Sequence, residues 1–181
     1  DTVRLQALMQ CAADLDIPAV FIRQSHLGGI RRILVATAGG LHTLQQMWVA
    51  REISATLNIP MHVVRLLRDE DHRDEPLFAA GRDRESAIEN WTSRLLGVGT
   101  DTKVLVTTDL VQGITACLRA GDLLVMGAPS PFHTADRFGE SLPAIVAETV
   151  DVPLILMHSR RPETIALRNL FWGRLAQVGA G

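Results

Sequence analysis

The sequence predicts an α/β protein built on a doubly wound parallel sheet of five strands. Short aliphatic or β-branched runs alternate with longer segments of helical spacing from residue 32 onward, which is the pattern of β-α-β units. These runs are continuous rather than alternating, as expected of strands that helices cover on both faces. A chain of 181 residues, 47% hydrophobic and 21% charged, has enough apolar material for one compact domain.

Five apolar runs are the predicted strands of this sheet. The last one contains Pro153 near its start, where a missing backbone N–H is tolerated. In chain order the strands are Arg32–Thr37, Met61–Leu67, Lys103–Thr107, Asp122–Met126 and Val152–His158.

Two long helices are predicted between the first three strands. Steps of three and four residues place apolar or small side chains on one face of each, which indicates packing on the sheet. The segment Leu41–Asn58 carries Met47, Ala50, Ser54 and Leu57 on that face, and Glu75–Leu96 carries Leu77, Gly81, Ile88, Trp91 and Leu95.

Two further helices are predicted from their capping residues. Asp109 followed by Gln112 resembles a capping box and starts a helix to Ala120, with Gly121 at its end. Ser141 can cap the other helix, which we expect to bury Leu142, Ile145, Val146 and Thr149. Trp48 lies off the predicted buried face of its helix.

Composition excludes several functional classes. The net charge of −2 without a basic cluster argues against a nucleic-acid partner, and no apolar run reaches the ~18 residues of a membrane-spanning helix. Cys11 and Cys117 show no metal-ligand spacing, and the six histidines contain no HxxxH pair, so no metal site is expected. The sole lysine, Lys103, follows no glycine-rich loop, and no GxSxG motif is present. We therefore expect no enzyme.

An internal comparison suggests a repeat. Residues 11–22 align with residues 146–157 at an offset of 135, and the pairs Ala12 and Ala147, Asp16 and Asp151, and Pro18 and Pro153 are identical. One interpretation is that residues 1–28 are the closing helix and strand of a preceding repeat. The alternative is an ordinary helix–strand extension that matches by chance.

The segments Asp122–Gly127, Asp151–Met157 and Ile33–Gly40, with Ser141 opening a helix, resemble the universal stress protein family from about Arg31 to Ser159. The resemblance implies a five-stranded parallel sheet of order 3-2-1-4-5. It also implies that an adenine nucleotide such as ATP, where bound, lies across the carboxyl ends of the first and fourth strands, in agreement with the general rule for open α/β sheets.

The resemblance implies a candidate nucleotide site whose motif is altered here. The nucleotide-binding members have Gly, two residues, Gly, nine residues, then Gly and Ser or Thr, whereas this chain has Gly127, Ser130, Glu140 and Ser141. The family's aspartate after the first strand aligns with Ala38. The candidate residues are Thr37, Ala38, Met126, Gly127, Ser130, His133, Arg137, Ser141 and Leu142. A tight loop and a helix cap that need no ligand would explain the same glycines and Ser141.

The chain divides into three expected parts: the extension 1–28, the stress-protein-like domain 29–160, and an amphipathic tail helix at 161–181. The tail either contacts a membrane or partner or folds back on its domain. Strand residues 17–23 are expected to pair antiparallel with Val152–His158 within the chain or across a homodimer. The leading hypothesis is a non-catalytic regulatory domain of a larger transporter-type protein, cytoplasmic and tethered through that parent chain, with a degraded nucleotide site. The alternative is a free-standing stress protein that binds ATP or another adenine nucleotide.

Overall fold

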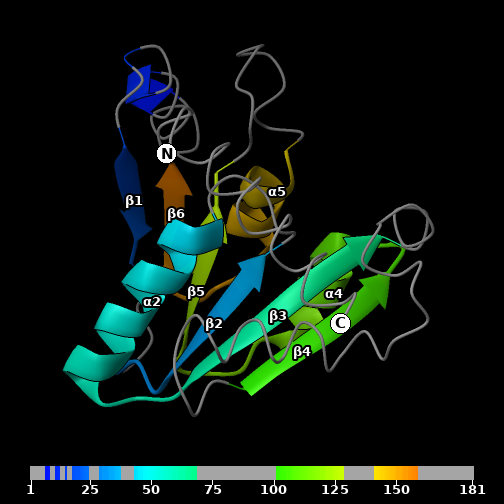
Figure 1. The fold of residues 1–181 in the computed structure, drawn as a ribbon. Helices are drawn as coiled ribbons and strands as arrows, with labels where there is room; N and C mark the ends of the chain where they lie inside the picture. The colour runs from blue at the N-terminus through cyan, green and yellow to red at the C-terminus, as the bar shows by residue number, and fades with distance from the viewer. Residues whose placement is uncertain are drawn as a thin grey trace, which may run out of the picture.

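A computed structural model describes residues 7–8, 11–12, 15, 18–24, 29–37, 43–68, 101–128 and 141–158. Within them the chain forms a six-stranded mixed sheet of order β1-β6-β5-β2-β3-β4 (Figure 1). The strands are β1 (Ala19–Arg23), β2 (Arg32–Thr37), β3 (Met61–Arg68), β4 (Asp101–Thr107), β5 (Asp122–Gly127) and β6 (Leu154–His158).

The five strands from β2 to β6 confirm the predicted parallel sheet. Read from β4 inward, they follow the order 3-2-1-4-5, and every contact among them is parallel. The sheet is larger than that core by one strand, because β1 joins it at the outer side of β6 in antiparallel orientation. The expected antiparallel pairing with the last strand is therefore confirmed within the chain for Ala19–Arg23, whereas residue 17 of the predicted strand lies outside the described residues.

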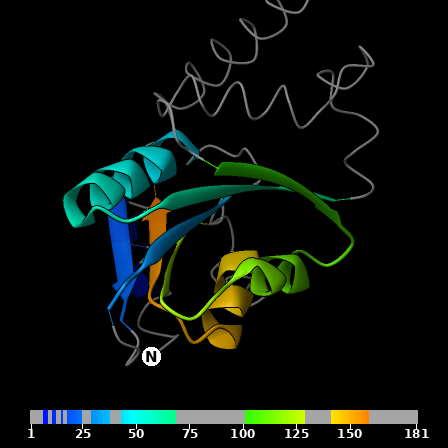
Figure 2. The same ribbon diagram turned by 90° about the horizontal axis from the view of Figure 1, so that it is seen from below.

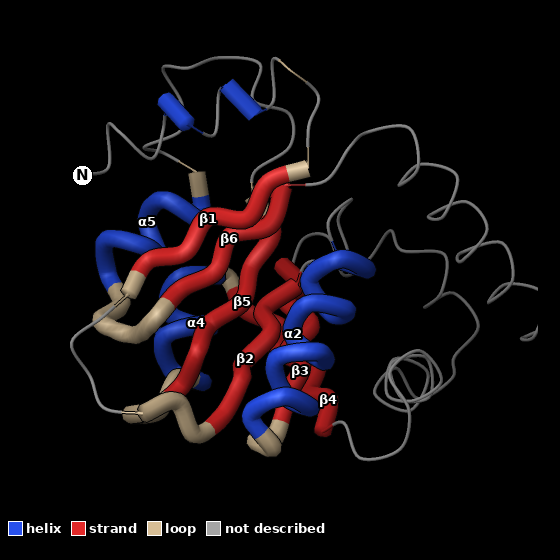
Figure 3. The backbone as a smooth tube through the Cα atoms, turned by 90° about the vertical axis from the view of Figure 1, so that its left-hand side faces the viewer, coloured by secondary structure: helices blue, strands red, loops and turns tan. Residues whose placement is uncertain are grey.

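Helices lie on both faces of the sheet, as a doubly wound fold requires. The helix α2 (Thr43–Leu57) covers one face, whereas α4 (Leu110–Cys117) and α5 (Leu142–Thr149) cover the other (Figures 2 and 3). Alternate strand residues separate into two apolar clusters. Ile33 and Val35 of β2 belong to the cluster that contains Met47 of α2, and Leu34 and Ala36 to the cluster that contains α4 and α5 residues.

The buried face of α2 agrees with the prediction except at its last turn. Met47 and Ala50 are almost completely buried, Ser54 is half-buried, and Trp48 is 65% exposed as expected. Leu57 is 49% exposed, contrary to expectation. It is the last residue of the helix, and Ser54 accepts the N–H of Ile59 there as the chain turns toward β3.

The start of α4 was predicted correctly and its end was not. The Asp109 side chain accepts the N–H of Gln112 at 3.0 Å, so the expected cap is present. The helix ends at Cys117 instead of Ala120, with Leu118 as its C-cap. Gly121, at φ +87°, belongs instead to the turn into β5, a conformation that favours glycine.

The prediction for α5 was wrong by one residue in phase. The buried residues are Pro143, Ala144 and Val146, while Ile145 and Thr149 face solvent. Together with the half-buried Ala147 and the buried Val150, positions 143, 146, 147 and 150 form the i, i+3, i+4, i+7 stripe that contacts the sheet. The sequence predicted the helix but placed its stripe one residue early.

Four strand boundaries also differ from the prediction. The strand β5 ends at Gly127, one residue later than predicted. The strand β4 begins at Asp101, two residues early, because its pairing with β3 starts at His62 opposite Asp101. The strand β6 begins at Leu154, two residues late, because its pairing with both neighbours starts there, opposite Leu124 of β5 and Arg23 of β1. The strand β3 continues to Arg68. The predicted helix Glu75–Leu96 and the tail helix at 161–181 lie outside the described residues.

The amino ends of the central strands are held together by a buried ion pair. Arg32 on β2 donates from Nε to Asp122 Oδ1 on β5 at 2.7 Å, and from a second nitrogen to Oδ2. It also donates to the carbonyl of Cys117, while the N–H of Arg119 donates to Asp122 Oδ2 at 2.7 Å. The hydrogen bond that Arg32 donates to Asp122 raises the pKa of Arg32 above its ordinary value, although burial opposes this shift. The guanidinium therefore stays charged.

The strand β1 is fastened at the same end of the sheet by Arg23. Its guanidinium donates to the carbonyls of Val150 at 2.6 Å, Val152 at 2.9 Å, and Ala147. These carbonyls lie in and just after the last turn of α5, where backbone acceptors have no partner within the helix. A positive charge also interacts favourably with the negative end of the helix dipole. Arg23 therefore ties the added strand to the parallel core.

Candidate functional site

The carboxyl ends of β2 and β5 form the switch point of the sheet. From β2 the chain runs through α2 to β3, and from β5 it runs through α5 to β6 on the opposite side. The two connections therefore diverge, and their helices lie on opposite faces (Figure 2). In open α/β sheets this divergence leaves a crevice outside the carboxyl ends, and ligands bind there.

The first turns of α2 and α5 lie at this end of the sheet. Each helix connects two parallel strands, so it runs back along the sheet and begins at the carboxyl end. Neither helix has an acidic residue in its first turn. Free N–H groups and the positive end of each helix dipole therefore face this edge without a carboxylate in the same turn, and such ends attract anions.

Ser141 is the N-cap of α5, and its hydroxyl is not used for capping. Its backbone is extended, and its carbonyl accepts the N–H of Ile145 at 3.0 Å. The side chain makes no capping hydrogen bond, and Oγ is buried without a hydrogen-bond partner. Buried hydroxyl groups nearly always have a partner, so this one is available to a ligand. Pro143 removes one amide donor from the same turn.

Gly127 lies next to Thr37 across the switch point, because the preceding residues Ala36 and Met126 are register partners. The hydroxyl of Thr37 is 2.8 Å from the hydroxyl of Thr43, the first residue of α2, and both residues are buried. The Met126 side chain is also buried, in the cluster that contains α5 residues. Thr37 and Met126 therefore lie buried at the adjoining ends of the two strands, and Gly127 offers backbone without a side chain.

The structure brings together five of the nine candidate residues at the carboxyl end. They are Thr37, Met126, Gly127, Ser141 and the half-buried Leu142. The other four, Ala38, Ser130, His133 and Arg137, lie outside the described residues.

Two polar residues of this region were missed by the sequence analysis. Arg65 is the β3 partner of Thr37 and is only 6% exposed. Strand alternation places it on the same face as Val63, which packs in the α2 cluster. Gln46, in the first turn of α2, is 4% exposed, and its Oε1 has no hydrogen-bond partner. The sequence did contain one indication of a buried arginine, because Arg65 is the only arginine within the apolar run 61–67.

The arrangement offers groups that can bind an anion. It combines two helix starts, a side-chain-free backbone at Gly127 and an unpartnered hydroxyl at Ser141. Within the described residues, the carboxyl ends of β2 and β5 carry no carboxylate and no imidazole that could serve as a general base.

Comparisons with known proteins agree with this fold. No protein-family model matches the chain, and no curated protein matches it in sequence. Among solved structures, a universal stress protein in complex with cAMP is 19% identical, with a TM-score of 0.53 over 73% of this chain and 99% of the other. A universal stress protein from Archaeoglobus fulgidus DSM 4304 is 12% identical, with a TM-score of 0.54 over 82% of this chain. The match spans about half, 51%, of that second protein.

The chain therefore has the fold of universal stress proteins, at low sequence identity. This finding confirms the α/β class and the resemblance derived from the sequence. No helix among the described ranges is long and apolar enough to cross a membrane.

Proposed function

We propose that this universal stress protein-like chain is a non-catalytic regulatory domain that binds an adenine nucleotide at the carboxyl ends of β2 and β5. The nucleotide's phosphate would lie at the start of α5, and its sugar and base would extend over Gly127 toward β2. Binding would change the affinity of the domain for a partner rather than consume the nucleotide.

The observation that carries this proposal is the buried, unpartnered hydroxyl of Ser141 at the start of α5. A phosphate oxygen there would accept a hydrogen bond from this hydroxyl and lie against the positive end of the helix dipole. The absence of acidic residues in the first turns of α2 and α5 supports the same ligand. The cAMP complex of a protein with this fold adds support for an adenine nucleotide.

The non-catalytic part of the proposal rests on the residues around the switch point. Hydrolysis of a phosphate ester needs a group that positions or deprotonates the attacking water. The described ends of β2 and β5 supply Thr37, Met126 and Gly127, and the Thr37 hydroxyl is already hydrogen-bonded to Thr43. We therefore expect bound nucleotide to remain intact.

The proposal also includes a place within a larger protein. A cytoplasmic domain attached to a transporter-type membrane protein would transmit nucleotide binding to that parent chain. This part is an analogy at the level of fold. Translation of the complete gene tests it, because a gene that encodes no membrane segment would exclude a transporter parent.

Thermal unfolding with and without nucleotide is the direct test of binding. At a ligand concentration 100 times Kd, selective binding to the native state adds about 2.7 kcal/mol, which raises Tm by about 5–10 °C in a chain of this size. The ligands to compare are cAMP, AMP, ADP and Mg-ATP, with inorganic phosphate and adenosine as the two halves of the ligand. We expect at least one nucleotide to raise Tm more than either half does.

Ser141→Ala should weaken nucleotide binding about tenfold, because it removes one hydrogen bond to a charged group, while Tm without ligand changes by less than about 2 °C. The matched control is Thr149→Ala at the far end of α5, where the hydroxyl donates to the carbonyl of Ile145. This control should bind nucleotide normally. A wild-type chain whose Tm is unchanged by all four nucleotides would exclude the proposed function.

A further inference from the structure

The structure contains two copies of one helix–strand unit, related by the 135-residue offset of the sequence repeat. Ala7, Leu8, Cys11 and Ala12 are helical, and adding 135 places them within α5. The same shift carries β1, Ala19–Arg23, onto β6, Leu154–His158, with both boundaries matched. If the sequence match were due to chance, the helix and the strand would not be expected to coincide as well. Their agreement therefore favours a true repeat.

The pairing of β1 with β6 has the symmetry of two identical strands. Phe21 lies opposite Leu156, which is also its equivalent in the repeat. Ala19 lies opposite His158 and Arg23 opposite Leu154, and the offset exchanges these two pairs. A twofold axis between two equivalent strands produces this register. A residue two positions before the centre of one strand then lies opposite the residue two positions after the centre of the other. The two units are thus related by a pseudo-twofold axis at Phe21 and Leu156.

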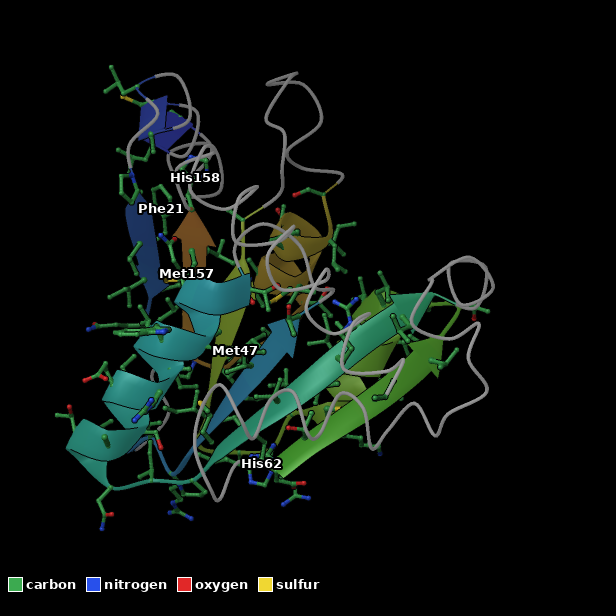
Figure 4. All side chains as sticks on the ribbon, viewed as in Figure 1. Phe21, Met47, His62, Met157 and His158 are labelled. Atoms are coloured by element: carbon green, nitrogen blue, oxygen red, sulfur yellow. The ribbon has the colours of Figure 1, made fainter. Side chains whose placement is uncertain are left out.

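The two copies differ in burial on the strand. Val20 and Ile22 of β1 are 49% and 67% exposed, whereas their equivalents Ile155 and Met157 are each 4% exposed. Met157 and Met47 lie in one cluster beneath α2, and both are labelled in Figure 4. The strand β6 also has a parallel neighbour, β5, on one side, whereas β1 has a strand partner only on its β6 side among the described residues.

The helix of the first copy shows the same difference. Leu8 is 54% exposed, Leu15 is 62% exposed, and Cys11 is exposed. Their equivalents in the second copy, Pro143, Val150 and Val146, are all buried against the sheet. Ala12 lies on the same face and is 4% exposed, whereas its equivalent Ala147 is half-buried. The face is therefore covered at Ala12 and open at Leu8, Cys11 and Leu15, where the second copy is buried.

We propose that the outer edge of β1, with the apolar face of Leu8, Cys11 and Leu15, docks a second unit of the same fold that precedes Asp1 in the same polypeptide. The strand of that upstream unit that corresponds to β5 would pair in parallel with β1. The helix that corresponds to α2 would cover Val20 and Ile22. The two sheets would then be continuous through the antiparallel contact of β1 with β6.

A second copy of the present chain would not fit this edge in the same way. Its own β5 already lies between β2 and β6, so it has no parallel strand to offer. The exposed positions of β1 and its helix are equivalent to positions of β6 and α5 that are buried in the core of the present domain. This match favours a second domain of the same fold as the partner over an unrelated protein.

Cysteine labelling tests this proposal in the polypeptide with its native upstream sequence and in the 181-residue chain. The background carries Cys11→Ala and Cys117→Ala, which keep both positions apolar, and the probe is Ile22→Cys. The matched control is Val106→Cys, which lies on the opposite edge strand β4 and is 42% exposed. We expect labelling at position 22 to be at least about tenfold slower in the longer polypeptide, with labelling at position 106 unchanged.

A second measurement does not depend on thiol chemistry. Ile22→Asp should change the Tm of the 181-residue chain by less than about 2 °C, and should lower that of the longer polypeptide by about 5–10 °C. Equal labelling rates or equal Tm shifts in the two polypeptides would overturn the proposal, as would an upstream sequence without a unit of this fold. Protection of position 22 that depends on the concentration of the 181-residue chain would also overturn it, in favour of a second copy.

Discussion

The two ends of the parallel strands differ in how their polar groups are used. At the amino end, Asp122 accepts hydrogen bonds from Arg32 and from the N–H of Arg119, and Arg23 donates to three carbonyls around the end of α5. His62, labelled at this end in Figure 4, lies 2.7 Å from Asp101 through Nδ1. At the carboxyl end, the buried oxygens of Ser141 and Gln46 have no hydrogen-bond partner.

This difference indicates a division of roles. Paired polar groups at the amino end stabilise the native arrangement, because removing one partner leaves the other buried and unsatisfied. Unpartnered groups at the carboxyl end contribute nothing to stability as they stand, so a ligand is the interaction that would use them. Thr102, near the amino end of β4, is an exception, because its buried Oγ1 also has no partner.

The largest effect is expected at Asp122, which is 1% exposed and bonded to Arg32. Asp122→Ala should lower the free energy of unfolding by about 3–5 kcal/mol, because it leaves the Arg32 guanidinium half-buried without its counter-ion. Since the pKa of Arg32 is raised, its charged form is present at neutral pH, and its contribution is lost on the alkaline side only as pH rises through the raised value. Urea denaturation at neutral pH measures the change.

The double variant Arg32→Met with Asp122→Leu is the control for that prediction. It removes both charges and replaces them with apolar groups of similar size, so it should recover most of the lost stability. If the free energy of unfolding of Asp122→Ala lay within about 1 kcal/mol of the wild-type value, the ion pair would not be what stabilises the amino end.

A smaller effect is expected at Arg23. Arg23→Ala removes the hydrogen bonds to the carbonyls of Ala147, Val150 and Val152. These are half-buried bonds from a charged donor, so we expect a loss of about 2 kcal/mol in the free energy of unfolding and faster amide exchange in β1. The matched control is Arg51→Ala, an exposed position on α2, which should leave both measurements unchanged. Unchanged exchange in β1 of the Arg23 variant would contradict the role of Arg23 as its fastening.

The smallest effect, of opposite sign, is expected at Thr102. Thr102→Val keeps the shape of the side chain and removes a buried hydroxyl without a partner, so the free energy of unfolding should rise by about 1 kcal/mol. Nucleotide binding should be unchanged, because Thr102 lies near the amino end of an edge strand. The result sharpens the comparison with Ser141, whose removal should affect binding and leave stability nearly unchanged. A loss of stability at Thr102 would show that its hydroxyl has a role in the folded state.

The parallel core could be predicted from the sequence because its determinants are local. Continuous aliphatic runs identify β2, β3 and β5, and Asp109 marks the start of α4 through a contact three residues away. The phase of α5 could not be predicted, because Pro143 and Ala144 face the sheet for a reason of tertiary packing that hydrophobicity alone does not encode. Boundaries such as the start of β4 depend on the register with β3.

The candidate site was predicted less completely than the fold. The resemblance located Gly127 and Ser141 at the carboxyl end, and the structure places both there. Arg65 was missed because a charged residue within a strand is normally assigned to a solvent face, and its burial follows from the position of β3 under α2. The hydrogen bond between Thr37 and Thr43 joins a strand end to a helix start, and only the fold shows that they meet.

The added strand has a consequence for the order of events during synthesis. Ala19 pairs with His158, 158 − 19 = 139 residues later, so β1 leaves the ribosome long before its partner exists. At about 5–20 residues per second, that interval lasts about 7–30 s. During that interval the edge of β1 that later pairs with β6 stays open, so the apolar segment Ala19–Arg23 can contact chaperones or other nascent chains along it. Among the described strands β1 is made earliest and its partner β6 latest, so their pairing reports that translation has passed residue 158.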